Sequence, residues 1–124
     1  MTALAKMAYV VIDTVDPLKL APFWIELLGL EVTAEVDDGR YVVLGTPAPE
    51  RGAPAIAFQR VPEGKSTKNR LHLDLVVENL DAATDAIVGM GGSWVDGETR
   101  SVGDYRWRCM ADPEGNEFDI VPED

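Results

Sequence analysis

The fold is decided by the stretch Asn69-Arg70-Leu71-His72-Leu73-Asp74-Leu75-Val76-Val77, which contains the only histidine of the chain. Its leucines recur at every second residue, whereas a helix would turn Leu73 away from the other two. This alternation is typical of a β-strand whose two faces meet different surroundings. We therefore predict a strand with an apolar back and a polar front, on which His72 and Asp74 point the same way.

A lone histidine on a strand has two interpretations. It can be a structural residue held in a hydrogen bond near the surface, or it can belong to a functional site. Asp74 could orient the imidazole of His72, although residues two apart on one strand face usually lie too far apart for a direct bond. As long as no other residue is known to lie near His72, the structural interpretation is the better one.

The rest of the chain predicts a βαβββ unit that occurs twice. In the first copy, strands are expected at residues 9–14, 30–36, 40–44 and 55–61, a helix at 17–28 and a loop at 46–54. In the second copy, strands are expected at residues 69–77, 93–95, 104–111 and 116–121, a helix at 80–90 and a loop at 96–103. A polar segment rich in Pro, Gly and Lys joins the two copies and reads as a linker.

The first helix has the clearest local signals. Asp16 can cap its N-terminus, Pro17 suits the first helical position, and Gly29 provides a left-handed stop. Trp24 falls on the apolar face of this helix, so we expect it in the core. Asp37-Asp38-Gly39 predicts a hairpin turn.

Matching positions support an internal repeat. Three pairs are separated by 63 positions: Tyr9 with His72, Asp16 with Asn79, and Gly29 with Gly92. Val61-Pro62 echoes Val121-Pro122, which makes Gln59 the counterpart of Asp119. If the polar faces of the two units enclose a cleft, one neighbourhood contains Tyr9, Gln59, His72 and Asp119.

Length and composition indicate one globular domain over residues 1–124. The net charge of −11 argues against nucleic acid and anionic membranes as partners. The acidity suits either a cationic ligand or solubility, and its spread along the chain favours solubility. The single Cys109 excludes an intramolecular disulfide. No apolar run is long enough to span a bilayer, so we expect a cytoplasmic protein.

The repeated βαβββ pattern, the histidine strand and the ending Ala111-Asp112-Pro113-Glu114-Gly115-Asn116-Glu117-Phe118 resemble the vicinal oxygen chelate superfamily. This group contains the glyoxalase, bleomycin-resistance and extradiol-dioxygenase proteins. The resemblance implies an α+β fold of two βαβββ modules in tandem, forming a curved mixed sheet around a cleft. The modules would cover residues 7–62 and 70–122, with the linker at 62–69.

The resemblance also implies a set of site residues. His72 matches the second-module histidine of metal-using members, and Asp119 stands where their metal-binding glutamate is expected. Tyr9 replaces the first-module histidine, and Gln59 falls near the first-module ligand. Only His72 and Asp119 are good metal donors, because tyrosine has an ordinary pKa of about 10. A divalent metal stays open but is not favoured, and the four polar residues could instead bind an organic ligand without a metal.

The resemblance further implies that Trp107, Cys109 and Tyr41 line the cleft and bind substrate. An aromatic wall of this kind suits a flat apolar ligand. Alternatively, Trp107 and Tyr41 are core residues, which is an equally good interpretation. Cys109 is expected to be an inert small residue.

Two function classes follow from the resemblance. The first is a lyase or isomerase in which His72 and Asp119 act on a proton beside a carbonyl group. Dioxygenase chemistry is disfavoured, because it needs two histidines and a carboxylate. The second is a non-enzymatic protein of the bleomycin-resistance type that sequesters a small molecule, for which the acidic balance of the chain would suit a cation. Either protein is expected to form a homodimer and to bind a small molecule.

Overall fold

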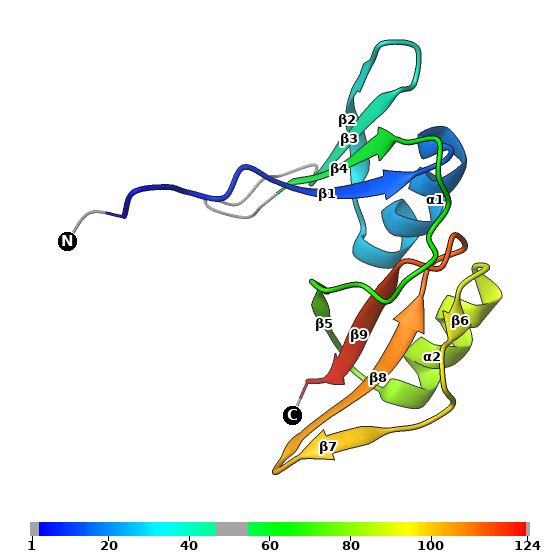
Figure 1. Cartoon of the computed structure of the whole chain (residues 1–124). Helices are drawn as coiled ribbons and strands as arrows, with labels where there is room; N and C mark the ends of the chain where they lie inside the picture. Colours follow the sequence, from blue (N-terminus) through cyan, green and yellow to red (C-terminus); the bar gives the residue numbers. More distant parts are fainter. Residues whose placement is uncertain (1–2, 47–54, 124) are drawn as a thin grey trace. The chain divides into compact units, whose positions relative to one another are not determined.

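The chain forms two compact units, Met1–Gly64 and Lys65–Asp124. The computed structural model describes residues 3–46 and 55–123. Each unit contains one helix that packs on one face of a mixed β-sheet (Figure 1). The fold is therefore α+β with two βαβββ-like modules, as the sequence predicts.

The first unit has the four-stranded sheet order β1-β4-β3-β2. Its elements are β1 (Tyr9–Thr14), α1 (Pro17–Leu28), β2 (Glu31–Val36), β3 (Tyr41–Gly45) and β4 (Ala55–Arg60). β1 runs parallel to β4, and the other neighbours are antiparallel. Of the predicted loop at 46–54, residues 47–54 lie outside the described part of the chain.

Helix α1 begins and ends where its capping residues predict. The Asp16 side chain accepts a hydrogen bond from the Lys19 backbone N–H at 3.3 Å, and Gly29 adopts a left-handed φ of 66°. The helix packs against β3 and β4. Trp24 is 2% exposed, so its predicted core position is confirmed. The predicted hairpin turn is also confirmed, because Asp37 and Asp38 both have positive φ between β2 and β3.

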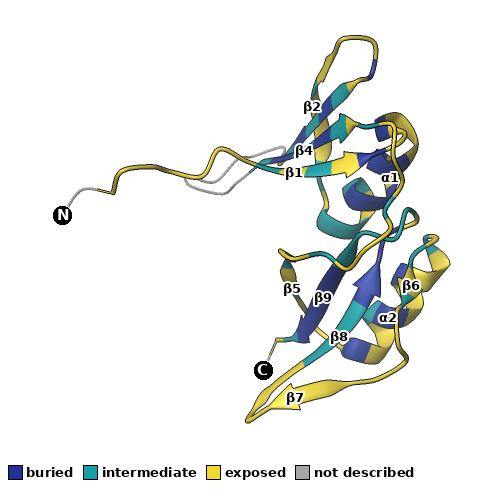
Figure 2. Cartoon of the chain, viewed as in Figure 1, coloured by how far each residue is buried: buried dark blue, intermediate teal, exposed yellow. Residues whose placement is uncertain are grey.

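The second unit has the sheet order β5-β9-β8-β6, with β7 paired to β8. Its elements are β5 (Asp74–Val77), α2 (Leu80–Gly89), β6 (Ser93–Trp94), β7 (Arg100–Val102), β8 (Tyr105–Ala111) and β9 (Glu117–Pro122). Strand β7 lies inside the predicted loop at 96–103. All three of its residues are exposed, so it has no apolar alternation by which the sequence could reveal it (Figure 2).

Strand β5 is shorter than the predicted strand at 69–77. Its ladder with β9 begins at the pair Asp74–Asp119, and the carbonyl of Leu73 just before it accepts a hydrogen bond from the Asp119 N–H at 2.8 Å. Leu71 is 76% exposed, against the predicted apolar back. The physical reason is that Asn69 is bound to the start of β9 through Glu117, so the chain bends before it enters the sheet. The expected alternation holds from His72 to Val77.

Helix α2 covers the apolar face of the second sheet. Asn79 caps it through a 2.8 Å hydrogen bond from the Ala82 N–H, and the helix packs against β6 and β9. Phe118 and Ile120 of β9 are at most 1% exposed, and β9 is drawn mostly as buried in Figure 2. None of the described helices is long and apolar enough to cross a membrane.

Candidate functional site

Three adjacent strands of the second unit place polar residues on one face. In the parallel ladder Asp74 of β5 lies opposite Asp119 of β9, and in the antiparallel ladder Cys109 of β8 lies opposite the same Asp119. Directly paired residues point to the same side of a sheet. Phe118 and Ile120 are buried on the helix side, so these three side chains lie on the face away from α2.

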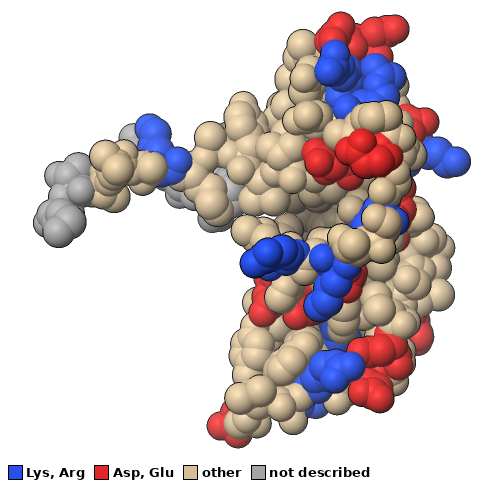
Figure 3. All heavy atoms as spheres, viewed as in Figure 1, with Lys and Arg blue, Asp and Glu red and all other residues tan. Residues whose placement is uncertain are grey.

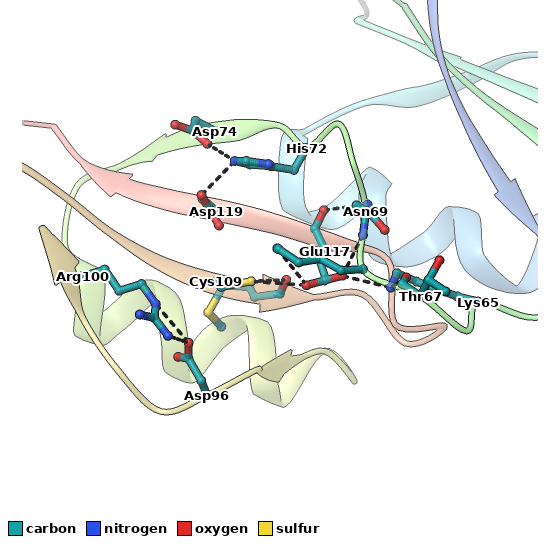
Figure 4. A network of polar contacts seen from close by, with 12 residues as sticks. Lys65, Thr67, Asn69, His72, Asp74, Asp96, Arg100, Cys109, Glu117 and Asp119 are labelled. Carbon is teal, nitrogen blue, oxygen red and sulfur yellow. Dashed lines mark hydrogen bonds and ion pairs between the residues drawn. The ribbon is translucent and has the colours of Figure 1, made fainter. Parts of the chain in front are cut away.

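His72 lies between two carboxylates on this face (Figure 4). Its Nε2 atom is 3.1 Å from Asp119 Oδ2 and 3.4 Å from Asp74 Oδ1. The close approach of Asp74 differs from the expectation for residues two apart on a strand. The physical reason is that His72 precedes the first residue of β5, so strand spacing does not hold its side chain away from Asp74.

We call His72, Asp74 and Asp119 the His72 cluster. Burial and the two neighbouring side chains all affect the pKa of Asp119. Burial raises the pKa of the Asp119 carboxyl, and the Asp74 carboxylate adds to the rise, whereas His72 opposes it. The Asp119 side chain is 12% exposed, against 38% for Asp74 and 43% for His72. Two neighbouring carboxylates thus share one imidazole, and a bound positive charge would relieve their repulsion.

The donors of the His72 cluster fit a divalent ion. One imidazole nitrogen and two carboxylate oxygens lie within 4.8 Å of one another, and the cluster is open to solvent at His72 and Asp74. Nitrogen and carboxylate donors of this kind suit Mn²⁺, Fe²⁺ or Zn²⁺. The sequence predicted His72 and Asp119 as metal donors. The structure places Asp74 of the same unit beside them as a third donor.

Tyr105 is a site residue that the sequence analysis missed. Its hydroxyl donates a hydrogen bond to Asp74 Oδ2 at 2.5 Å. This hydrogen bond raises the pKa of the Tyr105 hydroxyl. The signal that could have found it is the alternation along β8, which turns Tyr105 to the same face as Trp107 and Cys109.

Trp107 and Cys109 continue this face along β8. The Trp107 ring is half-buried, and its centroid lies 6.0 Å from that of Tyr105 with an interplanar angle of 41°. Cys109 Sγ is 3.9 Å from Glu117 Oε2, and burial raises the pKa of its thiol. Because a thiol held protonated is a poor nucleophile, this environment fits the inert role expected for Cys109.

Glu117 ties the segment before the His72 cluster to β9 (Figure 4). Its carboxylate lies 2.9 Å from Lys65 Nζ and 3.4 Å from Lys68 Nζ, and it accepts a hydrogen bond from the Asn69 N–H at 3.1 Å. Although burial acts in the other direction, the contacts with Lys65, Asn69 and Lys68 lower the pKa of Glu117. This anchor fixes the chain three residues before His72.

The predicted residues of the first unit fall in two places. Tyr41 of β3 and Gln59 of β4 lie directly opposite each other, so their side chains share one face. Tyr9 is 54% exposed and pairs with Ala55, four residues before Gln59 along β4. That offset corresponds to about 13 Å along a strand. Tyr9 therefore lies apart from the other two within this unit.

Strand register corrects the predicted counterpart of Asp119. The 63-residue repeat makes Val11 the counterpart of Asp74, and Val11 pairs with Ala57, whereas Asp74 pairs with Asp119. Ala57 is therefore the structural equivalent of Asp119, and the assignment of Gln59 to that position was wrong. The prediction relied on the match between Val61-Pro62 and Val121-Pro122, but the spacing between matching residues is not the same throughout the two copies.

On the face of the described residues shown in Figure 3, the charged groups are dispersed. Acidic and basic side chains alternate in small groups on the face shown in Figure 3, with no single acidic patch there. Of the chain's 22 acidic residues, the cluster contains two beside the only histidine. The acidity of the chain as a whole therefore says less about a ligand than these two carboxylates do.

Comparison with known proteins identifies related folds. The sequence profile of the family described as "Glyoxalase-like domain" matches residues 9–121. No curated protein gives a significant match. A glyoxalase/bleomycin resistance protein/dioxygenase family enzyme from Burkholderia phytofirmans is similar in structure, with a TM-score of 0.70 and 18% identity over 95% of this chain and 98% of that chain.

Two further solved structures share the fold. A member of the same superfamily from Sphaerobacter thermophilus has a TM-score of 0.69 and 20% identity over 97% of this chain and 98% of that chain. A mutant of the fosfomycin resistance protein FosX from Listeria monocytogenes, complexed with Mn(II) and 1S,2S-dihydroxypropylphosphonic acid, has a TM-score of 0.75 and 12% identity over 96% of this chain and 90% of that chain. At these identities the likeness shows the fold alone.

Proposed function

We propose, from the premise that the chain belongs to the glyoxalase-like domain family of the glyoxalase/bleomycin resistance/dioxygenase superfamily, that it is a lyase or isomerase acting beside a carbonyl group. The observation that carries this proposal is the position of the His72 imidazole between the Asp119 and Asp74 carboxylates, at 3.1 and 3.4 Å. These three side chains are the metal-binding residues of the proposal. A divalent ion bound there would polarise a substrate carbonyl as a Lewis acid.

Asp119 is the proposed group for proton transfer. In the metal-free protein, burial and the Asp74 carboxylate raise the pKa of Asp119, which makes its carboxylate a stronger base toward a substrate proton. A C–H bond beside the carbonyl breaks, the proton passes to an Asp119 oxygen, and the electron pair moves to the carbonyl oxygen as an enolate. With an α-hydroxycarbonyl substrate, an isomerase returns the proton to the former carbonyl carbon, while the α-hydroxyl passes its own proton to the former carbonyl oxygen and becomes the new carbonyl. A lyase instead expels a leaving group from the β-carbon as the enolate re-forms the carbonyl.

Metal analysis tests this function. The purified protein, dialysed against Mn²⁺, Ni²⁺, Zn²⁺ or Fe²⁺, should retain one ion per chain. His72→Ala and Asp119→Asn should lose it, while Asp85→Asn, which removes an exposed carboxylate from α2, should keep it. Absence of metal in the reconstituted wild type would refute the metal-dependent enzyme.

A binding protein is the second candidate, and the aromatic rings near the cluster favour it. Tyr105 contacts Asp74 and lies 6.0 Å from Trp107, so carboxylates and aromatic faces occur together, as in sites for organic cations. In the first unit, Val11 and Ala57 occupy the positions equivalent to Asp74 and Asp119, and their side chains cannot bind a metal ion. A cationic ligand at one hundred times its dissociation constant should stabilise the protein by about 2.7 kcal/mol. If planar and cationic compounds leave the melting temperature unchanged, sequestration is refuted.

The expected homodimer also belongs to the proposal. It is implied by the family resemblance, and light scattering of the purified full chain measures it directly. A monomer at micromolar concentration would contradict it.

A further inference from the structure

Tyr105 reaches the His72 cluster from the far side of β9. It is the first residue of β8 and pairs with Val102 of β7, so the β7–β8 hairpin holds its backbone. In the sheet order β9 lies between β5 and β8. The hydrogen bond from the Tyr105 hydroxyl to Asp74 Oδ2 therefore connects two strands that are not neighbours.

The two oxygens of Asp74 have different partners. Oδ2 accepts the hydrogen bond of Tyr105, and Oδ1 lies 3.4 Å from His72 Nε2. We propose that Tyr105 is a positioning residue, whose hydroxyl fixes the Asp74 carboxylate so that Oδ1 becomes the third donor beside His72 and Asp119. This inference rests on the proposed function of the His72 cluster as a cation site.

Asp74 needs such a partner. Its side chain is 38% exposed, so packing does not select its rotamer, and it faces the negative charge of Asp119. Repulsion would favour turning the carboxylate toward water, away from the other donors. A hydrogen bond from a neutral phenol opposes that rotation without placing a second cation in the site. Groups that orient metal ligands in this way typically change metal affinity by about 10- to 100-fold.

The Tyr105→Phe variant isolates the hydroxyl, because it keeps the ring next to Trp107. Thr99→Val is the matched control: it removes the 2.9 Å hydrogen bond between the loop before β7 and Arg108 of β8, and it changes neither charge nor size. Two properties are measured in the full-length protein. The first is Mn²⁺ affinity, from the paramagnetic resonance signal of the free ion. The second is the imidazole ¹⁵N resonances of metal-free protein at fixed pH, which belong to His72 because the chain has one histidine.

Tyr105→Phe should weaken Mn²⁺ binding by about 10-fold and shift the His72 resonances, and Thr99→Val should change the affinity by less than about twofold and leave the resonances in place. Wild-type affinity and unshifted resonances in Tyr105→Phe would overturn the positioning role, as would equal effects of both variants. If the wild type binds no Mn²⁺, the metal part of the proposed function fails by itself, and the His72 resonances alone then decide the role of Tyr105.

Discussion

Asp74 and Asp119 are cross-strand partners in the parallel ladder of β5 and β9, and both approach the Nε2 atom of one histidine. Parallel partners face the same side, so the sheet itself holds the two carboxylates together. Burial and the neighbouring Asp74 carboxylate raise the pKa of Asp119, so its ionised form should disfavour the fold of the metal-free protein, and the same proximity creates the proposed cation site. Stability and binding should therefore respond in opposite directions when one carboxylate is removed.

Asp119→Asn should stabilise the metal-free protein at pH 7 and abolish ion binding. The raised pKa of Asp119 means that its ionised form disfavours the folded state, a penalty that asparagine does not carry. Ion affinity should fall by more than about 100-fold, since outer partners alone are worth about 10- to 100-fold. Urea unfolding and metal titration measure the two effects. A less stable, metal-binding variant would contradict both expectations.

The local parts of this arrangement could be predicted from the sequence. Capping residues at Asp16 and Asn79 act within one helical turn, so they gave the helix starts correctly. The alternation from His72 to Val77 and around Asp119 gave the correct faces for the same reason, because side-chain direction in a strand depends only on its own residues, whereas Leu71 lies before the strand and is exposed.

Register and hairpin contacts could not be predicted in this way. Which residue of β4 lies opposite Val11 depends on how two distant segments pair, and the match between Val61-Pro62 and Val121-Pro122 pointed to Gln59 rather than Ala57. Tyr105 and Asp74 are 31 residues apart, so the alternation along β8 could give the face of Tyr105 but not its contact with Asp74. The site predicted from the sequence therefore lacked the contacts that depend on how distant segments pair, such as the contact of Tyr105 with Asp74.

Acid stability should depend on Glu117. Burial acts against ionisation, but Lys65, Asn69 and Lys68 together lower its pKa below the ordinary value of 4.5. A carboxylate with a lowered pKa stabilises the fold above its unfolded pKa, and this contribution is lost as the pH falls through the folded pKa. Glu117→Gln should remove that part of the pH dependence below about pH 4.5, measured by urea unfolding at several pH values.

The control for this experiment is Glu63→Gln, which changes an exposed carboxylate in the loop after β4. It should follow the wild-type pH profile. If Glu117→Gln follows that profile as well, the contacts of Glu117 do not contribute to acid stability.

Lys65 and Lys68 should contribute differently to the free energy of unfolding, although both contact Glu117. Lys65 lies at 2.9 Å with a side chain 18% exposed, whereas Lys68 lies at 3.4 Å and is 74% exposed. Lys65→Met should lower the free energy of unfolding by about 1–2 kcal/mol. Lys68→Met should cost less than about 0.5 kcal/mol, because solvent screens an exposed pair. Equal losses in chemical denaturation would show that burial does not separate the two lysines.

Alanine substitutions of Trp107 and Trp24 should distinguish a ligand-binding side chain from a core side chain. Trp24 is 2% exposed, and Trp24→Ala should cost about 3–5 kcal/mol of stability. Trp107 is half-buried on the face that carries the His72 cluster, so Trp107→Ala should cost less than about 2 kcal/mol. Any planar compound that raises the wild-type melting temperature should lose this effect in Trp107→Ala, because the ring is its proposed stacking partner. A large loss of stability with an unchanged ligand shift would instead assign Trp107 to the core, the alternative that the sequence left open.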